Sequence, residues 1–190
     1  MVIELFTSEC CSGCPPADAL LMELSQNGSG KTPEVIVLGE HVDYWNYIGW
    51  TDRFSSAAFS SRQQDYAARF HLASAYTPQM VIDGRTQLVG NDRSGVYRTI
   101  AAAAVAAKPA NISMSWEGAT RLHVVAQLTG SELAQVQLRT IGKMKNGKFD
   151  GEIEVPKKSD GNAKALKAVV FVQKGDDGPI LGAASLPFTP

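Results

Sequence analysis

The sequence predicts an α/β domain followed by a small antiparallel β-rich domain. Over residues 1–108, short apolar runs alternate with helical patterns in the order β-α-β-α-β-β-α, whereas residues 110–190 show apolar alternation with a period of two between turn residues. The length of 190 residues suits one large domain or two small ones, and an apolar content of 44% is that of an ordinary globular protein. We therefore expect two domains, residues 1–108 and residues 110–190.

The composition argues against several classes of partner. With 18 basic and 19 acidic residues the net charge is −1, so no basic surface for nucleic acid is expected. The longest apolar runs, such as residues 101–107 and 168–172, are far shorter than the roughly 20 residues that cross a bilayer, so no membrane span is expected. A strand-like run starts directly after Met1, which suits a cytoplasmic protein or an exported one whose leader has been removed. Nothing in the composition indicates the oligomeric state.

The chain begins with a predicted β-α-β unit. Residues 2–7 are β-branched and aromatic, as in a strand, and residues 35–38 are typical of a buried parallel strand. Between them, Pro15-Pro16 favours the start of a helix, because the N–H groups of a first helical turn have no intrahelical partner. The helix is supported by an apolar stripe at i, i+3, i+4 and i+7, formed by Ala17, Leu20, Leu21 and Leu24.

A second helix is predicted over residues 55–70. Phe59, Tyr66 and Phe70 should share one face, and Arg62 and Arg69 should be available to the other side. The following apolar runs, residues 79–82 and 86–89, flank Asp83-Gly84, a pair typical of a tight hairpin. An alanine-rich helix over residues 94–107 then ends before Pro109.

The second half of the chain has the pattern of antiparallel strands. Alternation is clear over residues 122–128, recurs at Val136 and Leu138, and is followed by a strand candidate at residues 167–172. Turns are expected at Asn146-Gly147, Asp160-Gly161 and Asp177-Gly178. We expect about five strands in a small sandwich or open sheet, without a catalytic motif.

All three cysteines fall within five positions, at Cys10, Cys11 and Cys14. A disulfide scaffold would scatter them, and a zinc site would normally add a second C-x-x-C or paired histidines. The motif Cys11-Ser12-Gly13-Cys14 lies instead between a strand and a helix, with Cys11 expected at or just before the helix start. Amide hydrogens and the helix dipole there favour a thiolate, while the charge of Asp18 opposes it. We expect a dithiol that closes to a disulfide; two inert buried thiols are the alternative.

Several polar and aromatic side chains are candidates for the same site. Glu4 is a carboxylate within an apolar strand, so it either has a buried partner or points to solvent at an edge. His41 and Asp43 follow the second strand, whose carboxyl end should share a sheet edge with Cys11. An imidazole there would assist thiol deprotonation, bind a metal or serve only the structure. Trp45 would line a peptide groove or pin its loop to the core.

The C-x-x-C after the first strand, Thr77-Pro78 before an apolar strand, the Asp83-Gly84 hairpin and the following Val89-Gly90 together resemble the thioredoxin-like superfamily. This resemblance implies that Pro78 is cis and lies beside Cys11. It implies that Thr77 and Pro78 hold a partner strand by main-chain hydrogen bonds. It also implies that Glu4 is the buried acid that accepts a proton beneath the disulfide.

A closer resemblance is to the bacterial family named domain of unknown function 1223. It rests on four stretches that together span nearly the whole chain: E-L-F-T-S-E-C-C-S-G-C-P-P-A-D at 4–18, H-V-D-Y-W at 41–45, Y-T-P-Q-M at 76–80 and I-L-G-A-A at 180–184. The chain departs from the family pattern at Cys10, where a glycine is expected. The resemblance implies an exported, periplasmic bacterial protein.

These residues favour a thiol-disulfide oxidoreductase in which Cys11 attacks a partner disulfide and Cys14 resolves the mixed disulfide. Its partners would be protein or small-molecule thiols and disulfides, with no cofactor other than its own disulfide; both reductase and oxidase directions fit. The first alternative is a copper chaperone using Cys10, Cys14 and His41, because Cys10-x-x-x-Cys14-Pro15 is similar to the C-x-x-x-C-P of copper chaperones for cytochrome oxidase. The second is a thioredoxin-like binding module without catalysis.

Overall fold

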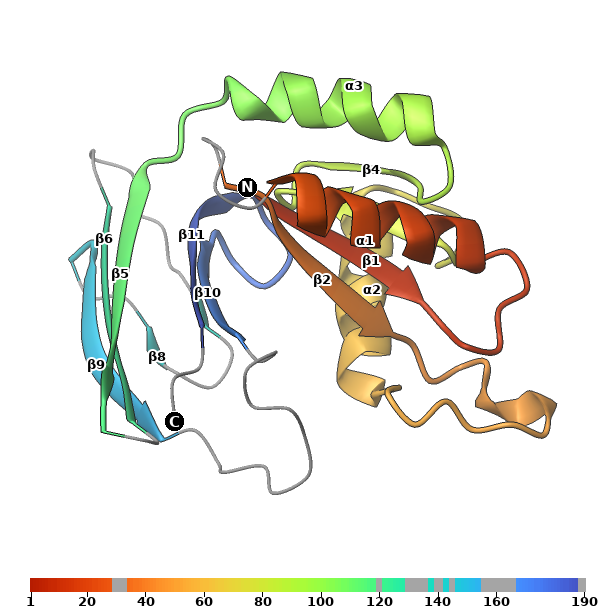
Figure 1. Cartoon of the computed structure of the whole chain (residues 1–190), viewed down its shortest axis with the longest axis horizontal. Coiled ribbons are helices and arrows are strands. Elements are labelled where there is room, and N and C mark those ends of the chain that lie inside the picture. Colours follow the sequence, from red (N-terminus) through yellow and green to blue (C-terminus); the bar gives the residue numbers. More distant parts are fainter. Residues whose placement is uncertain are drawn as a thin grey trace. The chain divides into compact units, whose positions relative to one another are not determined.

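The structure of the protein is a computed structural model (Figure 1). It describes residues 1–28, 34–118, 121–128, 137–138, 142–143, 146–154 and 167–187. By its contacts the chain divides into two compact units. The first contains Met1–Ala106 and the short segment Asp176–Pro179, and the second contains Ala107–Gly175 and Ile180–Pro190. The segment Asp176–Pro179 therefore belongs to the first unit. A division of the chain into residues 1–108 and 110–190 does not include this segment in the first domain. In the described part of the chain, no helix has the length and apolar character to cross a membrane.

The first unit is a four-stranded mixed sheet with helices on both faces. Its strands lie in the order β2-β1-β3-β4, with β1 and β2 parallel and the other neighbours antiparallel. Along the chain the elements are β1 (Val2–Thr7), α1 (Pro15–Gly28), β2 (Ile36–His41), the 3-10 helix η1 (Asn46–Ile48), α2 (Ala57–Arg69), β3 (Gln79–Ile82), β4 (Thr86–Val89) and α3 (Arg93–Ala104). The predicted order β-α-β-α-β-β-α is confirmed.

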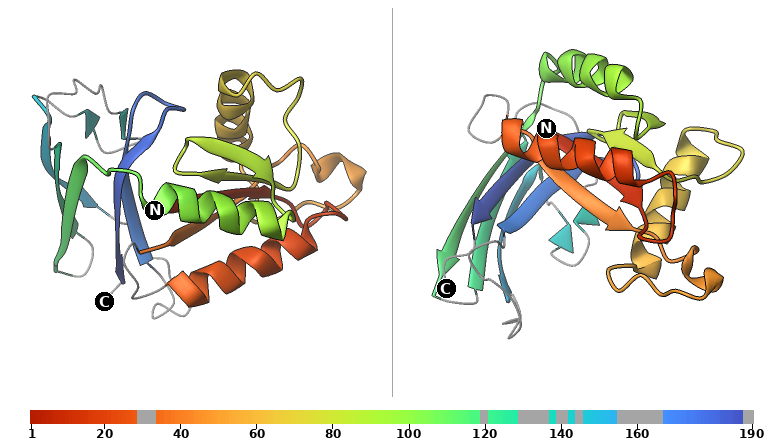
Figure 2. Two further views of the ribbon diagram at one scale, coloured as in Figure 1. Left: turned by 90° about the horizontal axis from the view of Figure 1, so that it is seen from above. Right: turned by 45° about the vertical axis from the view of Figure 1, so that its right-hand side comes forward.

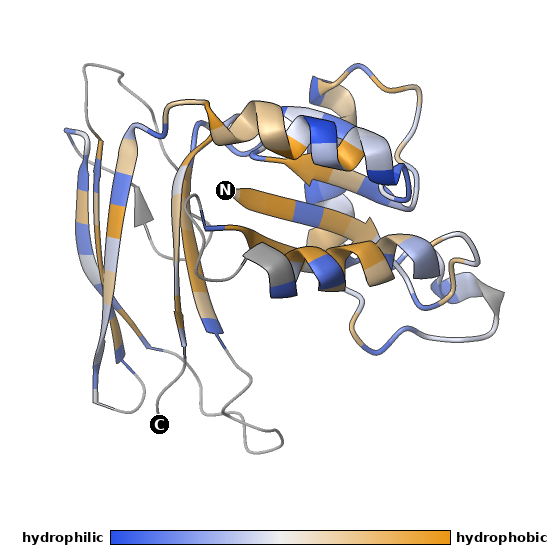
Figure 3. Cartoon of the chain, turned by 45° about the horizontal axis from the view of Figure 1, so that its top comes forward, coloured by the Kyte–Doolittle hydropathy of each residue, from blue (hydrophilic) through white to orange (hydrophobic). Residues whose placement is uncertain are grey.

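Two apolar clusters hold the helices to the sheet. In one cluster, Leu20 and Leu24 of α1 and Val96 of α3 pack against Ile3 and Leu5 of β1. Helices α1 and α3 accordingly lie on the same side of the sheet in both views of Figure 2. On the opposite face, Tyr66 of α2 packs with side chains of the neighbouring strands and loop, Phe6, Val42 and Val81. Covered on both faces, β1 is buried throughout and hydrophobic along nearly its whole length (Figure 3).

Helix α1 begins later than the sequence analysis expected. Cys11 was placed at or just before its start, but the first helical residue is Pro15, and the carbonyl of Cys14 accepts the first bonds, from the N–H groups of Ala17 at 2.8 Å and Asp18 at 3.0 Å. A helix starting at Cys11 would need N–H donors at positions 15 and 16 for the carbonyls of residues 11 and 12, and proline has none. The two prolines therefore hold the four-residue cysteine turn outside the helix.

Helix α2 corrects the predicted placement of Arg62. The helix starts after Ser56, whose side chain accepts a hydrogen bond from the N–H of Ala58. Arg62 lies one turn before Tyr66 and is buried on the same face, not on the opposite one as the sequence analysis expected. Arg69, also expected on that other side, is partly buried and donates to the carbonyls of Gly84 and Asp177 within the first unit.

The Asp83-Gly84 hairpin is confirmed. Both residues have a positive φ, 51° and 59°, and the N–H of Arg85 bonds to the carbonyl of Ile82 at 3.0 Å, as in a turn with two left-handed central residues. Asp83 also fixes the turn to β1, because its carboxylate accepts the N–H of Val2 at 2.9 Å.

The second unit consists of antiparallel strands around their own core. β5 (Ala110–Glu117), β6 (Arg121–Leu128) and β9 (Lys148–Glu154) form one sheet, β10 (Lys167–Gln173) pairs with β11 (Ile180–Pro187), and the short β7 (Gln137–Leu138) pairs with β8 (Gly142–Lys143). Side chains of both larger sheets share one cluster that includes Leu122, Val124, Val170, Val172 and Leu181. The described residues of this half form seven strands, two of them very short, where about five were expected. Val136 and the expected turn at Asp160-Gly161 lie outside the described residues.

A glycine in the I-L-G-A-A stretch allows β11 to approach β5 closely. A Cβ atom at Gly182 would overlap the carbonyl oxygen of Ala110, so a larger residue at 182 would push the two strands apart. This contact gives a structural reason for the glycine in that stretch.

Candidate redox site

The three cysteines lie in the turn between β1 and α1. Cys11 and Cys14 form a disulfide with a Cα–Cα distance of 5.4 Å. The turn is held by backbone hydrogen bonds of 3.1 Å, from the N–H of Cys11 to the carbonyl of Ser8 and from the N–H of Cys14 to the carbonyl of Cys11. The expected closure of the C-x-x-C is therefore present, which is compatible with redox chemistry.

The three cysteines differ in solvent exposure. Cys14 is fully buried, Cys11 is 4% exposed, and Cys10 is a free cysteine of intermediate exposure. A partner that opens the disulfide must attack an accessible sulfur, so Cys11 is favoured over Cys14. The Cys10 thiol donates to the carbonyl oxygen of Trp50 at 3.6 Å.

Pro78 lies against the cysteine turn. The Thr77–Pro78 peptide bond is cis, as the resemblance implied, and the proline ring packs against Gly13, where a Cβ atom would be 3.9 Å from Pro78 Cδ. The carbonyl of Pro78 accepts the N–H of Gly90 at 2.9 Å, which fixes the segment to the end of β4. Trp45 supports the preceding residue, because its Nε1–H donates to Thr77 Oγ1 at 2.8 Å.

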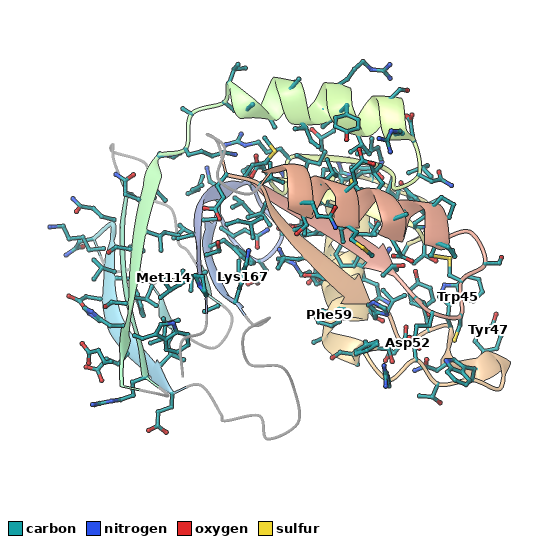
Figure 4. All side chains as sticks on the ribbon, viewed as in Figure 1. Trp45, Tyr47, Asp52, Phe59, Met114 and Lys167 are labelled. Carbon is teal, nitrogen blue, oxygen red and sulfur yellow. A yellow bond between two sulfur atoms is a disulfide. The ribbon has the colours of Figure 1, made fainter. Side chains whose placement is uncertain are left out.

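A buried carboxylate that the sequence analysis did not identify joins the cysteine turn to His41. Asp52 lies in the loop between β2 and α2, as does Trp45 (Figure 4), and is 1% exposed. One carboxylate oxygen, Oδ2, accepts both the N–H of Glu9 at 2.8 Å and His41 Nδ1 at 2.7 Å. Burial alone would raise the pKa of Asp52, but the hydrogen bonds from Glu9, His41 and Phe54 outweigh burial and lower the pKa.

His41 lies where the sequence analysis placed it, at the carboxyl end of β2. It pairs in register with Thr7, the last residue of β1, so the imidazole and the cysteine turn share one edge of the sheet. Its ring also contacts Phe54, with the ring centroids 5.5 Å apart. The side chain is 25% exposed and thus open to solvent or a partner.

Asp18 is a second acid near the disulfide. It lies one turn after Cys14 on α1 and accepts a hydrogen bond from Thr7 Oγ1 at 2.7 Å. Burial raises the pKa of Asp18; the hydroxyl of Thr7 and the charge of His41 oppose this rise only in part, and the charge of Asp52 adds to it. The carboxylate of Asp18 is therefore within reach of the charges of His41 and Asp52, and Thr7 holds it by a hydrogen bond.

Glu4 is buried in an ion pair. The carboxylate is fully buried, so the alternative of a solvent-facing edge is wrong, and it accepts Arg62 Nε at 2.6 Å and the Tyr66 hydroxyl at 2.8 Å. Arg62 Nε also lies 3.7 Å from Glu40 Oε1. Burial opposes the charge of Arg62, but Glu4, Tyr66 and Glu40 outweigh it and raise the pKa of the guanidinium. Glu4 is thus a buried acid with two hydrogen-bond donors, and the proton-accepting role that the resemblance implies for it stays a prediction.

Asp43 serves helix α2. Its N–H donates to Ser60 Oγ at 3.0 Å, and the Ser60 hydroxyl donates back to its carboxylate. Asp43 follows the end of β2 as expected, and its carboxylate is bonded to Ser60 of α2; a metal or auxiliary role for it stays a prediction.

The residues of the copper alternative are not gathered into one ligand set. Cys14 is bonded to Cys11, Cys10 contacts Trp50, and His41 contacts Asp52. Across the described residues, no group of three or more His, Cys, Asp and Glu side chains is arranged to hold a metal ion.

Comparison with known proteins places the chain in a family. Its structure is similar to the X-ray crystal structure of protein AGR_C_4864 from Agrobacterium tumefaciens, with a TM-score of 0.73 and 27% sequence identity over 99% of this chain and 94% of that one. No curated protein matches the chain. The model of the family described as protein of unknown function (DUF1223) matches residues 2–140. The chain therefore belongs to the DUF1223 family.

Proposed function

We propose that the protein is a thiol-disulfide oxidoreductase built on a thioredoxin-like core, residues 1–108, with a β-rich domain over residues 110–190. The observation that carries this proposal is the Cys11–Cys14 disulfide between the first strand and the first helix, in which Cys11 is 4% exposed and Cys14 is fully buried. The first-turn amides of α1 and its positive dipole end favour a thiolate in the preceding turn. The cis Pro78 packed on Gly13 supports the thioredoxin-like assignment.

In the proposed reaction the Cys11 thiolate attacks one sulfur of a partner disulfide. The partner S–S bond breaks, a Cys11–partner disulfide forms, and the second partner sulfur leaves as a thiolate. Cys14 then loses its proton and attacks Cys11, which releases the first partner sulfur and closes the Cys11–Cys14 disulfide. Two electrons pass from the protein to the partner, and the reverse sequence oxidises a partner dithiol.

The partner is proposed to be a protein or small-molecule thiol or disulfide that docks along Thr77 and Pro78. The hydrogen bond from Trp45 to Thr77 keeps this segment in place beside the cysteine turn. The exposed aromatic side chains of the neighbouring loop, Tyr47, Trp50 and Phe54, offer apolar contacts to an extended peptide. A formed disulfide also suits the oxidising periplasm that the family resemblance implies.

Trapping of the mixed disulfide tests the proposal. In a Cys14→Ser variant the resolving thiol is absent, so incubation with oxidised glutathione or a disulfide-bonded protein should leave one partner attached at Cys11, located by peptide mass mapping. Cys10→Ser in the same background is the matched control and should retain the adduct. An adduct only at Cys10, or none, contradicts the assignment of Cys11 as nucleophile and favours a binding module.

A further inference from the structure

Asp52 is a buried carboxylate whose position the proposed chemistry has not yet used. Removing a carboxylate from water is costly unless hydrogen bonds compensate, and Asp52 has three donors within 2.9 Å. One of its oxygens, Oδ1, accepts the N–H of Phe54 and organises its own loop. The other, Oδ2, reaches outside that loop to two segments distant in the sequence.

The two donors to Oδ2 come from the edge of the sheet that carries the disulfide. Glu9 N–H belongs to the turn that continues into Cys11, and His41 Nδ1 belongs to the last residue of β2. Because both bond to the same atom, at 2.8 and 2.7 Å, the imidazole is held beside the backbone two residues before Cys11. Asp52 thus fixes the position of His41 relative to the cysteine turn.

The same hydrogen bond selects the chemistry available to His41. A carboxylate accepts only, so Nδ1 carries the proton in the neutral imidazole, and Nε2 is left as the basic nitrogen. A carboxylate that orients an imidazole in this way is the usual support for a histidine that transfers protons. With a quarter of the side chain exposed, His41 is not sealed within the core.

We propose that the Asp52–His41 pair is the proton-transfer element of the dithiol, with His41 as the acid-base group and Asp52 as its positioning residue. The inference rests on the proposed oxidoreductase function. When Cys14 attacks the Cys11–partner disulfide, its thiol proton passes to His41 Nε2. The partner sulfur leaves as a thiolate and takes that proton from the imidazolium, so charge and protons balance without any other reagent.

The groups that face His41 define the competing explanations. Asp52 and Phe54 contact it from the β2–α2 loop, Asp18 acts on it from α1 through charge, and Thr7 holds Asp18 from the end of β1. Arg53 of the same loop lies over the Phe54 ring at 4.7 Å. Asp18 is the strongest rival, since it follows Cys14 by one helical turn and could itself take the proton.

The equilibrium constant between the wild-type protein and glutathione is measured first. The test is then the pH dependence of the rate at which oxidised glutathione oxidises the reduced protein. His41→Gln keeps a donor for Asp52 but cannot transfer a proton, and Asp52→Asn removes the orienting charge. Both should slow the reaction near neutral pH by about 100-fold, the lower range for acid-base catalysis, and should remove the same ionisation from the profile. The equilibrium constant with glutathione should stay unchanged, because a proton-transfer catalyst accelerates both directions.

A second His–Asp pair in the chain supplies the matched control. His123 Nε2 lies 2.7 Å from Asp150 Oδ1 in the second unit, and His123→Gln and Asp150→Asn should leave rate and profile as in the wild type. A wild-type profile in His41→Gln overturns the proposal, as does a profile that changes only in Asp18→Asn. If Asp52→Asn fails to fold by circular dichroism, His41→Gln decides alone. Absence of any reversible dithiol couple in the wild type refutes the proposed function itself and is therefore distinguishable from failure of this inference.

Discussion

Replacing Arg62 by methionine should destabilise the first unit strongly. The change removes the 2.6 Å contact to Glu4, the 2.9 Å hydrogen bond to Tyr66 and the 3.3 Å hydrogen bond to the carbonyl of Asp176. Glu4 then keeps its hydrogen bond from Tyr66 but loses the positive charge beside it, and Glu40 loses a cation 3.7 Å away. Breaking one partner from a buried ion pair costs about 3–5 kcal/mol, a large share of the free energy of unfolding of an ordinary domain.

The measurement is chemical denaturation of the full chain followed by tryptophan fluorescence. Trp45 reports on the first unit, and the exposed Arg93, which pairs with Glu23 at 2.5 Å, provides Arg93→Met as a control of the same chemical change. That control should change the midpoint little, because exposed pairs are screened by solvent. Adding Glu4→Gln to Arg62→Met should restore part of the loss, since a neutral amide has no buried charge to compensate. Equal midpoints for Arg62→Met and Arg93→Met would refute the reasoning.

Three other substitutions or modifications have definite expected outcomes. Burial raises the pKa of Asp18 in the folded state, so ionisation of this carboxyl opposes folding. The stability that its protonated form contributes is complete below the pKa of the unfolded state and is lost as pH rises through the pKa of the folded state. Asp18→Asn should therefore remove this decline from a series of unfolding free energies measured against pH. A decline that persists in the variant contradicts this origin. Gly182→Ala should lower the free energy of unfolding by about 1–3 kcal/mol, because the added Cβ overlaps Ala110. Gly39→Ala is the control and should be tolerated, since the nearest side-chain atom would be 3.9 Å from its Cβ. Equal unfolding midpoints for the two variants would exclude the close contact at Gly182. In the oxidised protein, iodoacetamide should label only Cys10, the free cysteine. After reduction, Cys11 should be labelled faster than the fully buried Cys14, as measured by peptide mass mapping of timed samples. Faster labelling of Cys14 would contradict the order of reactivity assigned to the two cysteines.

Local signals were sufficient to predict most elements of the fold. Proline and glycine mark boundaries whatever the tertiary context, which is why Asp83-Gly84 correctly indicated a hairpin. The same prolines also explain the misplaced start of α1. Pro15 and Pro16 are well suited to a first turn, but without N–H groups they cannot bond the carbonyls of Cys11 and Ser12, and the sequence analysis used only the first of these properties.

The candidate site was predictable only where its residues are close in sequence. Cys11 and Cys14 are three positions apart, so the turn alone brings them together. Arg62 pairs with Glu4 across 58 positions, and Asp52 reaches Glu9 across 43. Asp52 stands in an aromatic loop without periodicity, so no pattern marks its burial. Arg62 could have been inferred from its i, i+4 spacing to Tyr66, since both then face the buried acid of β1.

The reversible exchange of two electrons at Cys11 and Cys14 is the property on which the proposed function depends. Equilibration in a series of glutathione buffers, followed by acid quenching, alkylation and peptide mass mapping, measures the oxidised fraction of each cysteine separately. We expect Cys11 and Cys14 to change together along one two-electron curve that is the same from the reduced and the oxidised starting material, while Cys10 stays outside that pair. Independent curves for Cys11 and Cys14, or a disulfide that no glutathione ratio opens, would contradict the proposal.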